Sequence, residues 1–286
     1  MNDLILHPTT EIQLTNYLNK PSHAITLVAP PGMGKHSIAL LLASKLLKID
    51  NARLFNYPYY KLVSSLDSKA IGVDSIRDLE HFLSLKVPNR SSIQRVIVIE
   101  DAQMLTIEAQ NAFLKTLEEP PIGTVFILSS TQGHALLPTI RSRSPNLIIT
   151  KPDYNSLRAY FESNGHGQVE VKQALLVSGG LPGLASAILT PNNEHPLIPA
   201  TELSRTILAL SKYNRLLHID TLVKDKQLAL NTLFILQRMA HISLLTASST
   251  SAKEWLRILK YSYNAEVSLL SNGQAKLVLT NLMLHL

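Results

Sequence analysis

The sequence has 286 residues, and at about 150 residues per domain it is long enough for two or three domains. Hydrophobic residues make up 45% of it and charged residues 17%, which excludes a disordered chain, and the absence of cysteine excludes disulfides and cysteine-ligated zinc sites. The net charge of +6 is concentrated after residue 199, where ten Lys and Arg residues stand against five Asp and Glu residues, so this segment presents either a solvated helical surface or a basic face for nucleic acid or an acidic partner.

The chain carries no signal for a membrane or for export. Its apolar runs, such as Val96–Ile99, are far too short to cross a bilayer, and the N-terminus lacks a basic segment followed by an apolar one. None of the ten histidines is spaced as H-x-x-x-H or H-x-x-E-H, so no metal site is expected. We therefore expect a soluble cytoplasmic protein without a membrane partner.

Residues 1–150 show a pattern of short apolar runs that alternate with helical stretches. A capping box at Thr10–Gln13 predicts a helix ahead of the first run. The expected strands lie at residues 24–29, 61–64, 95–99, 124–128 and 146–149. Nearly continuous apolar strands separated by helices predict an α/β domain, in which a parallel sheet carries helices on both faces.

The remainder of the sequence is helical in pattern. Pro152–Asp153 can start a helix and Gly179–Gly180 can end another, which predicts a small helical domain with a linker over residues 151–198. Three prolines between Pro191 and Pro199 mark that linker. Leucines at helical spacing then predict an all-α domain over residues 199–286.

A glycine-rich segment follows the first expected strand and precedes a helix that we place at residues 37–48. Such a loop can cradle a phosphate with its backbone N–H groups and a lysine. The candidate residues are Pro31, Gly32, Met33, Gly34, Lys35, His36 and Ser37. Ala29 stands where the first glycine of the P-loop pattern belongs, and His36 stands where a Ser or Thr hydroxyl holds Mg²⁺. The segment is therefore either a weak phosphate-binding loop or a relic that keeps its turn and binds nothing.

Two carboxylates, Glu100 and Asp101, end the third expected strand. In a P-loop enzyme such a pair holds the Mg²⁺ shell and polarises the attacking water. Here Glu precedes Asp, the reverse of the AAA+ order, which misplaces both groups by about one bond, and small misplacements are costly in catalysis. The alternative is that both carboxylates simply cap the following turn.

The most distinctive block runs from Leu105 to Pro121. Its residues Ala109, Phe113 and Leu117 share one helix face, Thr106 can cap the start, and two prolines stop the helix. The block resembles the N-A-L-L-K-T-L-E-E-P-P segment of bacterial clamp-loader AAA+ subunits.

Further segments extend this resemblance over residues 5–190. Ser142-Arg143-Ser144 is similar to the Ser-Arg-Cys motif of clamp loaders, and Ser130 and Thr131 fall where that family has sensor 1. Residues 72–77 and 178–183 resemble segments of the delta prime subunits of the DNA polymerase III clamp loader, with Pro182 where ATP-binding relatives place the sensor 2 arginine. The four-cysteine zinc module of most members is missing, so no zinc is expected.

The resemblance implies a delta prime role. It implies a stator subunit that assembles with gamma/tau and delta through a C-terminal collar and helps to load the sliding clamp onto primer–template DNA. It also implies that Arg143 acts in trans as an arginine finger, against the simpler alternative of a salt bridge at a domain edge. We expect no intrinsic ATPase and no required cofactor, with weak ATP or ADP binding left open. The alternatives are an ATP-hydrolysing gamma/tau-like motor, which would use Lys35, Glu100 and Asp101, and a free-standing AAA+ adaptor of DNA repair.

Overall fold

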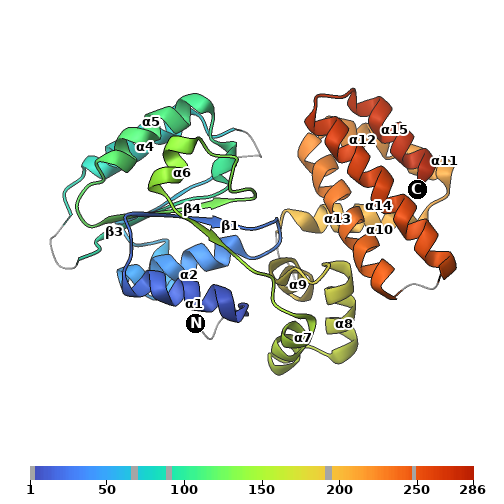
Figure 1. The fold of residues 1–286 in the computed structure, drawn as a ribbon, viewed down its shortest axis with the longest axis horizontal. Helices are drawn as coiled ribbons and strands as arrows, with labels where there is room; N and C mark the ends of the chain where they lie inside the picture. Colours follow the sequence, from blue (N-terminus) through green and yellow to red (C-terminus); the bar gives the residue numbers. More distant parts are fainter. Residues whose placement is uncertain (1–3, 66–69, 88–91, 191–194, 247–248) are drawn as a thin grey trace. The chain divides into compact units, whose positions relative to one another are not determined.

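The computed structural model describes residues 4–65, 70–87, 92–190, 195–246 and 249–286, and they form two compact units, residues 1–152 and 153–286 (Figure 1). The elements of the first unit are α1 (Pro8–Asn19), β1 (Ala24–Val28), α2 (Lys35–Leu47), α3 (Asn51–Leu54), β2 (Tyr60–Val63), α4 (Val73–Ser84), β3 (Arg95–Ile99), the 3₁₀ turn η2 (Ala102–Met104), α5 (Ile107–Glu118), β4 (Thr124–Ser130), α6 (Pro138–Arg143) and β5 (Asn146–Ile148).

The five strands pair in parallel in the order β2-β3-β4-β1-β5. Helices α4, α5 and α6 cover one face of the sheet and α1 and α2 cover the other (Figure 1). This confirms the predicted α/β class. Strands β3 and β4 are buried along their whole length, because both faces are covered, and this explains the apolar runs at residues 96–99 and 125–128.

The core of the first unit joins the sheet to the distinctive helix α5. Phe113 on α5 and Phe126 on β4 are fully buried, with ring centroids 5.4 Å apart and planes at 79°. Thr106 caps α5 as predicted, since its side chain accepts a hydrogen bond from Ala109 N at 3.1 Å. The same helix is then anchored at its start and along its buried face.

One local prediction in the first unit is wrong. Thr10 does not cap α1: His7 does, and Thr10 is buried with its hydroxyl accepting from Thr150 N at 2.9 Å. Pro8 explains the earlier start, because proline fits the first helical position. Helix α6 runs from Pro138 to Arg143, so Arg143 is the last residue of this helix.

The second unit is helical throughout its described part. Its helices are α7 (Tyr154–Ser163), α8 (Gln168–Val177), α9 (Pro182–Leu189), α10 (Leu197–Ala209), α11 (Lys212–Leu216), α12 (Ile219–Lys224), α13 (Lys226–Thr246), α14 (Ser249–Leu270) and α15 (Ala275–His285). Asp153 caps α7, and Gly179 and Gly180 follow α8 with φ angles of 66° and 68°. A shared core that includes Leu233, Leu236 and Met283 holds the last helices together.

The predicted linker differs from the structure at its end. Residues 191–194 lie outside the described residues, and α10 already begins at Leu197, so Pro199 sits in its first turn. Proline is tolerated there because the first backbone N–H groups of a helix have no partner within it. Both predicted helical regions, 151–198 and 199–286, fall in the second unit except for residues 151 and 152. No helix in the described residues has the length and apolar character needed to cross a membrane.

Candidate functional site

The predicted phosphate-binding loop connects β1 to α2 at the carboxyl edge of the sheet. Gly32 and Gly34 adopt φ angles of 77° and 81°, a left-handed conformation that glycine adopts without a steric penalty. Pro31 precedes this turn, and Met33 between the glycines is buried. The sequence therefore builds the turn of a P-loop correctly.

Lys35 bends back onto its own loop. Its Nζ donates to the carbonyl oxygens of Ala29 at 2.8 Å and Pro30 at 3.2 Å. Burial lowers the pKa of Lys35, and the nearby charges of Asp101 and Glu100 act in the opposite direction. The ammonium group thus donates to carbonyl oxygens of the loop, whereas the lysine of a P-loop donates to a bound phosphate.

His36 and Glu100 form an ion pair across the end of the sheet. The Nδ1 of His36, on the first turn of α2, contacts the Oε1 of Glu100, which directly follows β3. This hydrogen bond raises the pKa of His36, so it favours the imidazolium form. Ser37 lies half-buried one position further along α2 and therefore points in a different direction around the helix.

The arrangement does not fit Mg²⁺. P-loop enzymes hold the ion between a Ser or Thr hydroxyl and a strand-end carboxylate. Here the hydroxyl is replaced by the imidazole of His36, and the carboxylate of Glu100 is already paired with it. In its protonated form, which the contact with Glu100 favours, the ring repels a divalent cation. Among the described residues, no group of three or more His, Asp or Glu side chains is arranged to hold a metal ion.

A chain of hydrogen bonds joins the second carboxylate to the predicted sensor 1 segment. Asp101, with a left-handed φ of 45°, receives a hydrogen bond from Gln103 Nε2 at 3.1 Å, and Gln103 Oε1 accepts from Thr131 N at 3.2 Å. Ser129 Oγ accepts from Asp101 N at 3.1 Å, while the buried Ser130 donates to Gln132 O at 2.9 Å. The network orders this edge of the sheet, and Asp101 is held within it.

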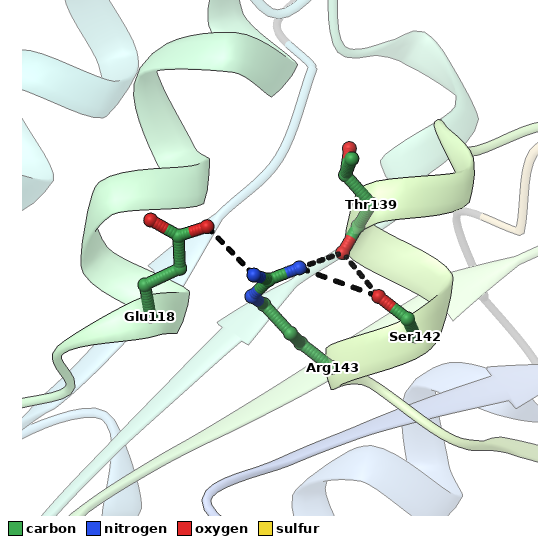
Figure 2. Close-up of polar contacts among 4 residues, drawn as sticks. All are labelled: Glu118, Thr139, Ser142 and Arg143. Carbon is green, nitrogen blue, oxygen red and sulfur yellow. Dashed lines mark hydrogen bonds and ion pairs between the residues drawn. The ribbon is translucent and has the colours of Figure 1, made fainter.

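Arg143 lies at the opposite edge of the sheet. Helices α5 and α6 run against the strands that they connect, so both end near the amino ends of the strands. Figure 2 shows the Arg143 guanidinium between these two helix ends. Its Nη2 contacts Glu118 Oε1 at 2.7 Å, and its Nη1 donates to Thr139 O at 3.1 Å and Ser142 Oγ at 3.3 Å. Arg143 is therefore separated from the loop of its own chain.

Comparison with known proteins identifies the family. A family model described as DNA polymerase III, delta subunit, matches residues 9–153, half of the chain. The delta prime subunit of DNA polymerase III from Haemophilus influenzae is 29% identical over 177 residues, 57% of this chain and 54% of the relative. That of Escherichia coli is 30% identical over 205 residues, 66% of this chain and 61% of the relative. The chain belongs to the delta prime family of DNA polymerase III subunits.

Other similarities are narrower. The matches cover about half to three fifths of the length of these delta prime relatives. DNA polymerase III subunit tau of Bacillus subtilis is 33% identical over 150 residues, 48% of this chain and 26% of the relative. The gamma subunit-related protein of Thermotoga maritima superposes with a TM-score of 0.54 at 19% identity over 96% of this chain and 97% of its own, a likeness of fold.

Residues without a predicted role also take part in these contacts. Glu118, within the segment Leu105–Pro121, contacts Arg143, and Gln103 accepts a hydrogen bond from Thr131 N. No motif in the sequence assigns a role to either residue. Ser144, in place of the family's cysteine, is buried and shares a 2.5 Å hydrogen bond with the hydroxyl of Thr26 on β1. A polar Thr26 within an apolar strand was the one available signal, since a buried hydroxyl requires a partner.

Proposed function

We propose that this chain is the delta prime subunit of a DNA polymerase III clamp loader, a cytoplasmic assembly partner of gamma/tau and delta. In this role it acts as a stator while the sliding clamp is placed on primer–template DNA. It supplies Arg143 to the ATP site of a neighbouring subunit and hydrolyses no ATP itself. Membership of the delta prime family supports the assignment.

The observation that carries the proposal is the pairing of His36 with Glu100 in the degenerate loop. A P-loop motor holds a metal ion between its Ser or Thr hydroxyl and its strand-end carboxylate. In this chain the residues at those two positions, His36 and Glu100, contact each other directly. Lys35 is at the same time occupied by the carbonyls of Ala29 and Pro30. Hydrolysis at this loop would require both contacts to break.

Arg143 supports the second half of the proposal. Its guanidinium is always charged and offers several donors to phosphate oxygens. Because it sits at the edge opposite to its own loop, it cannot complete the loop of its own chain, whereas it can reach a site on an adjacent chain. Such arginines raise turnover by about 10³–10⁵ in phosphoryl-transfer systems that use them.

The end of the chain supports assembly through residues 199–286. Leu256, Tyr263 and Leu270 follow one another at intervals of seven residues on α14, and their exposed fractions are 55%, 57% and 59%. An apolar stripe of this kind is typical of helices that pack against a partner. We assign it to the collar that joins this chain to the other subunits.

A gamma/tau-like motor is the second candidate, favoured by the similarity to tau and by the presence of Lys35, Glu100 and Asp101. Steady-state ATP hydrolysis by the isolated chain separates the two. We expect no turnover above background, and equal values for the Lys35→Ala variant. Turnover that Lys35→Ala abolishes would instead identify a motor.

Co-purification tests the assembly. The chain mixed with purified gamma/tau and delta should elute with both in size-exclusion chromatography. The control replaces Leu256, Tyr263 and Leu270 with serine, and this variant should keep its helical content but lose the complex. Elution of the unmodified chain on its own, in the presence of both partners, would contradict the assignment.

A further inference from the structure

We propose that Glu118 is a positioning residue that holds Arg143 against the chain's own helices until an anion on a neighbouring chain displaces it. The contact between the two side chains stands on this structure alone. The use of the released arginine rests on the proposed function.

The geometry occupies both terminal nitrogens of the guanidinium. Nη1 donates to the carbonyl of Thr139 and the hydroxyl of Ser142, while Nη2 contacts the Glu118 carboxylate (Figure 2). Three of the five N–H donors of an arginine are then engaged within the chain. A bidentate contact with phosphate through both terminal nitrogens requires these internal partners to be exchanged.

Helix electrostatics give an independent reason to assign Glu118 a purpose. It is the last residue of α5, where the negative end of the helix dipole disfavours a carboxylate. Pro120 and Pro121 follow after one residue, Glu119, so the helix cannot continue and Glu118 stays at its end. Arg143 is the last residue of α6, where a cation is favoured. The carboxylate of Glu118, which the dipole of its own helix disfavours, therefore lies beside the cation of Arg143, which the dipole of its helix favours.

The exposure of the pair makes it exchangeable. The Arg143 side chain is 35% exposed and that of Glu118 is 47% exposed. Ion pairs at such positions are weak and are screened by salt. A triphosphate brings more charge and more acceptor oxygens than one carboxylate, so it can replace Glu118 without unfolding either helix.

Chemical modification of the isolated chain tests the contact. Phenylglyoxal reacts with arginine side chains, and peptide mass spectrometry gives the rate at Arg143 separately from that at Arg141. We expect Glu118→Gln to raise the rate at Arg143 by about twofold to fivefold, which corresponds to the loss of one exposed ion pair. Glu119→Gln is the matched control, because Glu119 is the adjacent exposed glutamate, and it should leave the rate unchanged.

The salt dependence of the modification rate at Arg143 distinguishes the loss of an ion pair from a general loosening of the fold. In 1 M NaCl the rate in the unmodified chain should rise toward that of Glu118→Gln, which itself should change little. Equal rates in Glu118→Gln and the unmodified chain at low salt, or an equal rise in Glu119→Gln, would overturn the proposal.

Reconstitution with gamma/tau and delta tests the use of the released arginine. Glu118→Gln should lower the concentration of this chain that half-saturates ATP turnover by about the same factor, with the maximal rate unchanged. The double variant with Arg143→Ala should behave as Arg143→Ala alone. If Arg143→Ala is silent while the modification result holds, the proposed function fails and the contact stands. If Arg143→Ala impairs turnover but Glu118→Gln does not alter it, the positioning role is overturned.

Discussion

Replacement of Arg143 with alanine separates the structural role of this residue from its role in an assembly. In the folded chain the change removes one partly exposed ion pair with Glu118, worth about 0.2–1 kcal/mol. It also removes a cation from the end of α6, worth about 0.3–1 kcal/mol. The contacts with Thr139 and Ser142 lie at the exposed surface of the same helix, where water replaces them. The free energy of unfolding should therefore fall by no more than about 2 kcal/mol.

The effect on the assembled complex should be much larger. A guanidinium that stabilises charge in a transition state loses its whole contribution when it is truncated. We expect clamp-stimulated and DNA-stimulated ATP hydrolysis, and clamp loading, to fall by about tenfold or more. The complex with gamma/tau and delta should itself form normally, because Arg143 is remote in sequence from the helical region proposed for assembly.

The assay compares two arginines of one helix. The Arg143→Ala and Arg141→Ala chains are each reconstituted with unmodified gamma/tau and delta, and ATP turnover and clamp loading are measured together with urea unfolding of the free chains. Arg141 is exposed on α6 two residues before Arg143, and its replacement should have the smaller effect. Unchanged clamp loading with Arg143→Ala would refute the reasoning that this side chain acts in trans.

Three further predictions concern the loop and the core. The hydrogen bond that His36 donates to Glu100 raises the pKa of His36 above its usual 6.5, so the pair stabilises the fold fully below pH 6.5 and loses its effect as the pH rises through the raised pKa. Because His36 is 53% exposed, the effect is small: the free energy of unfolding in urea should fall between pH 6 and pH 9 by up to about 1 kcal/mol more in the unmodified chain than in His36→Gln. Phe113→Ala should lower the free energy of unfolding by about 3–5 kcal/mol, because it empties a fully buried site beside Phe126. Phe113→Leu introduces the leucine that the clamp-loader segment N-A-L-L-K has at this position, and it should lower the free energy of unfolding by less than half as much. The dissociation constant of any ADP complex that calorimetry detects with the isolated chain should change by less than about twofold when Mg²⁺ is added. A strong dependence of this constant on Mg²⁺ would contradict our interpretation of His36.

Much of the fold could be predicted because its signals are local. The apolar runs of β3 and β4 reflect burial on both faces, the glycines of the loop reflect left-handed backbone angles, and Thr106 reflects the unpaired N–H groups at a helix start. The start of α1 was predicted wrongly because two residue types competed for it. Thr10 has the chemistry of a cap, but a buried position beside Thr150 used its hydroxyl elsewhere.

The sequence by itself determined which groups are present: a loop without a hydroxyl ligand, two carboxylates in reversed order and an arginine in a recognisable motif. Only the tertiary structure decided how they pair. His36 and Glu100 are 64 residues apart, and Thr26 and Ser144 are 118 apart. Their contacts follow from the strand order β2-β3-β4-β1-β5, which brings the ends of distant strands together. Strand order is set by packing of the whole sheet rather than by any short segment, so these two pairings could not be seen in the sequence.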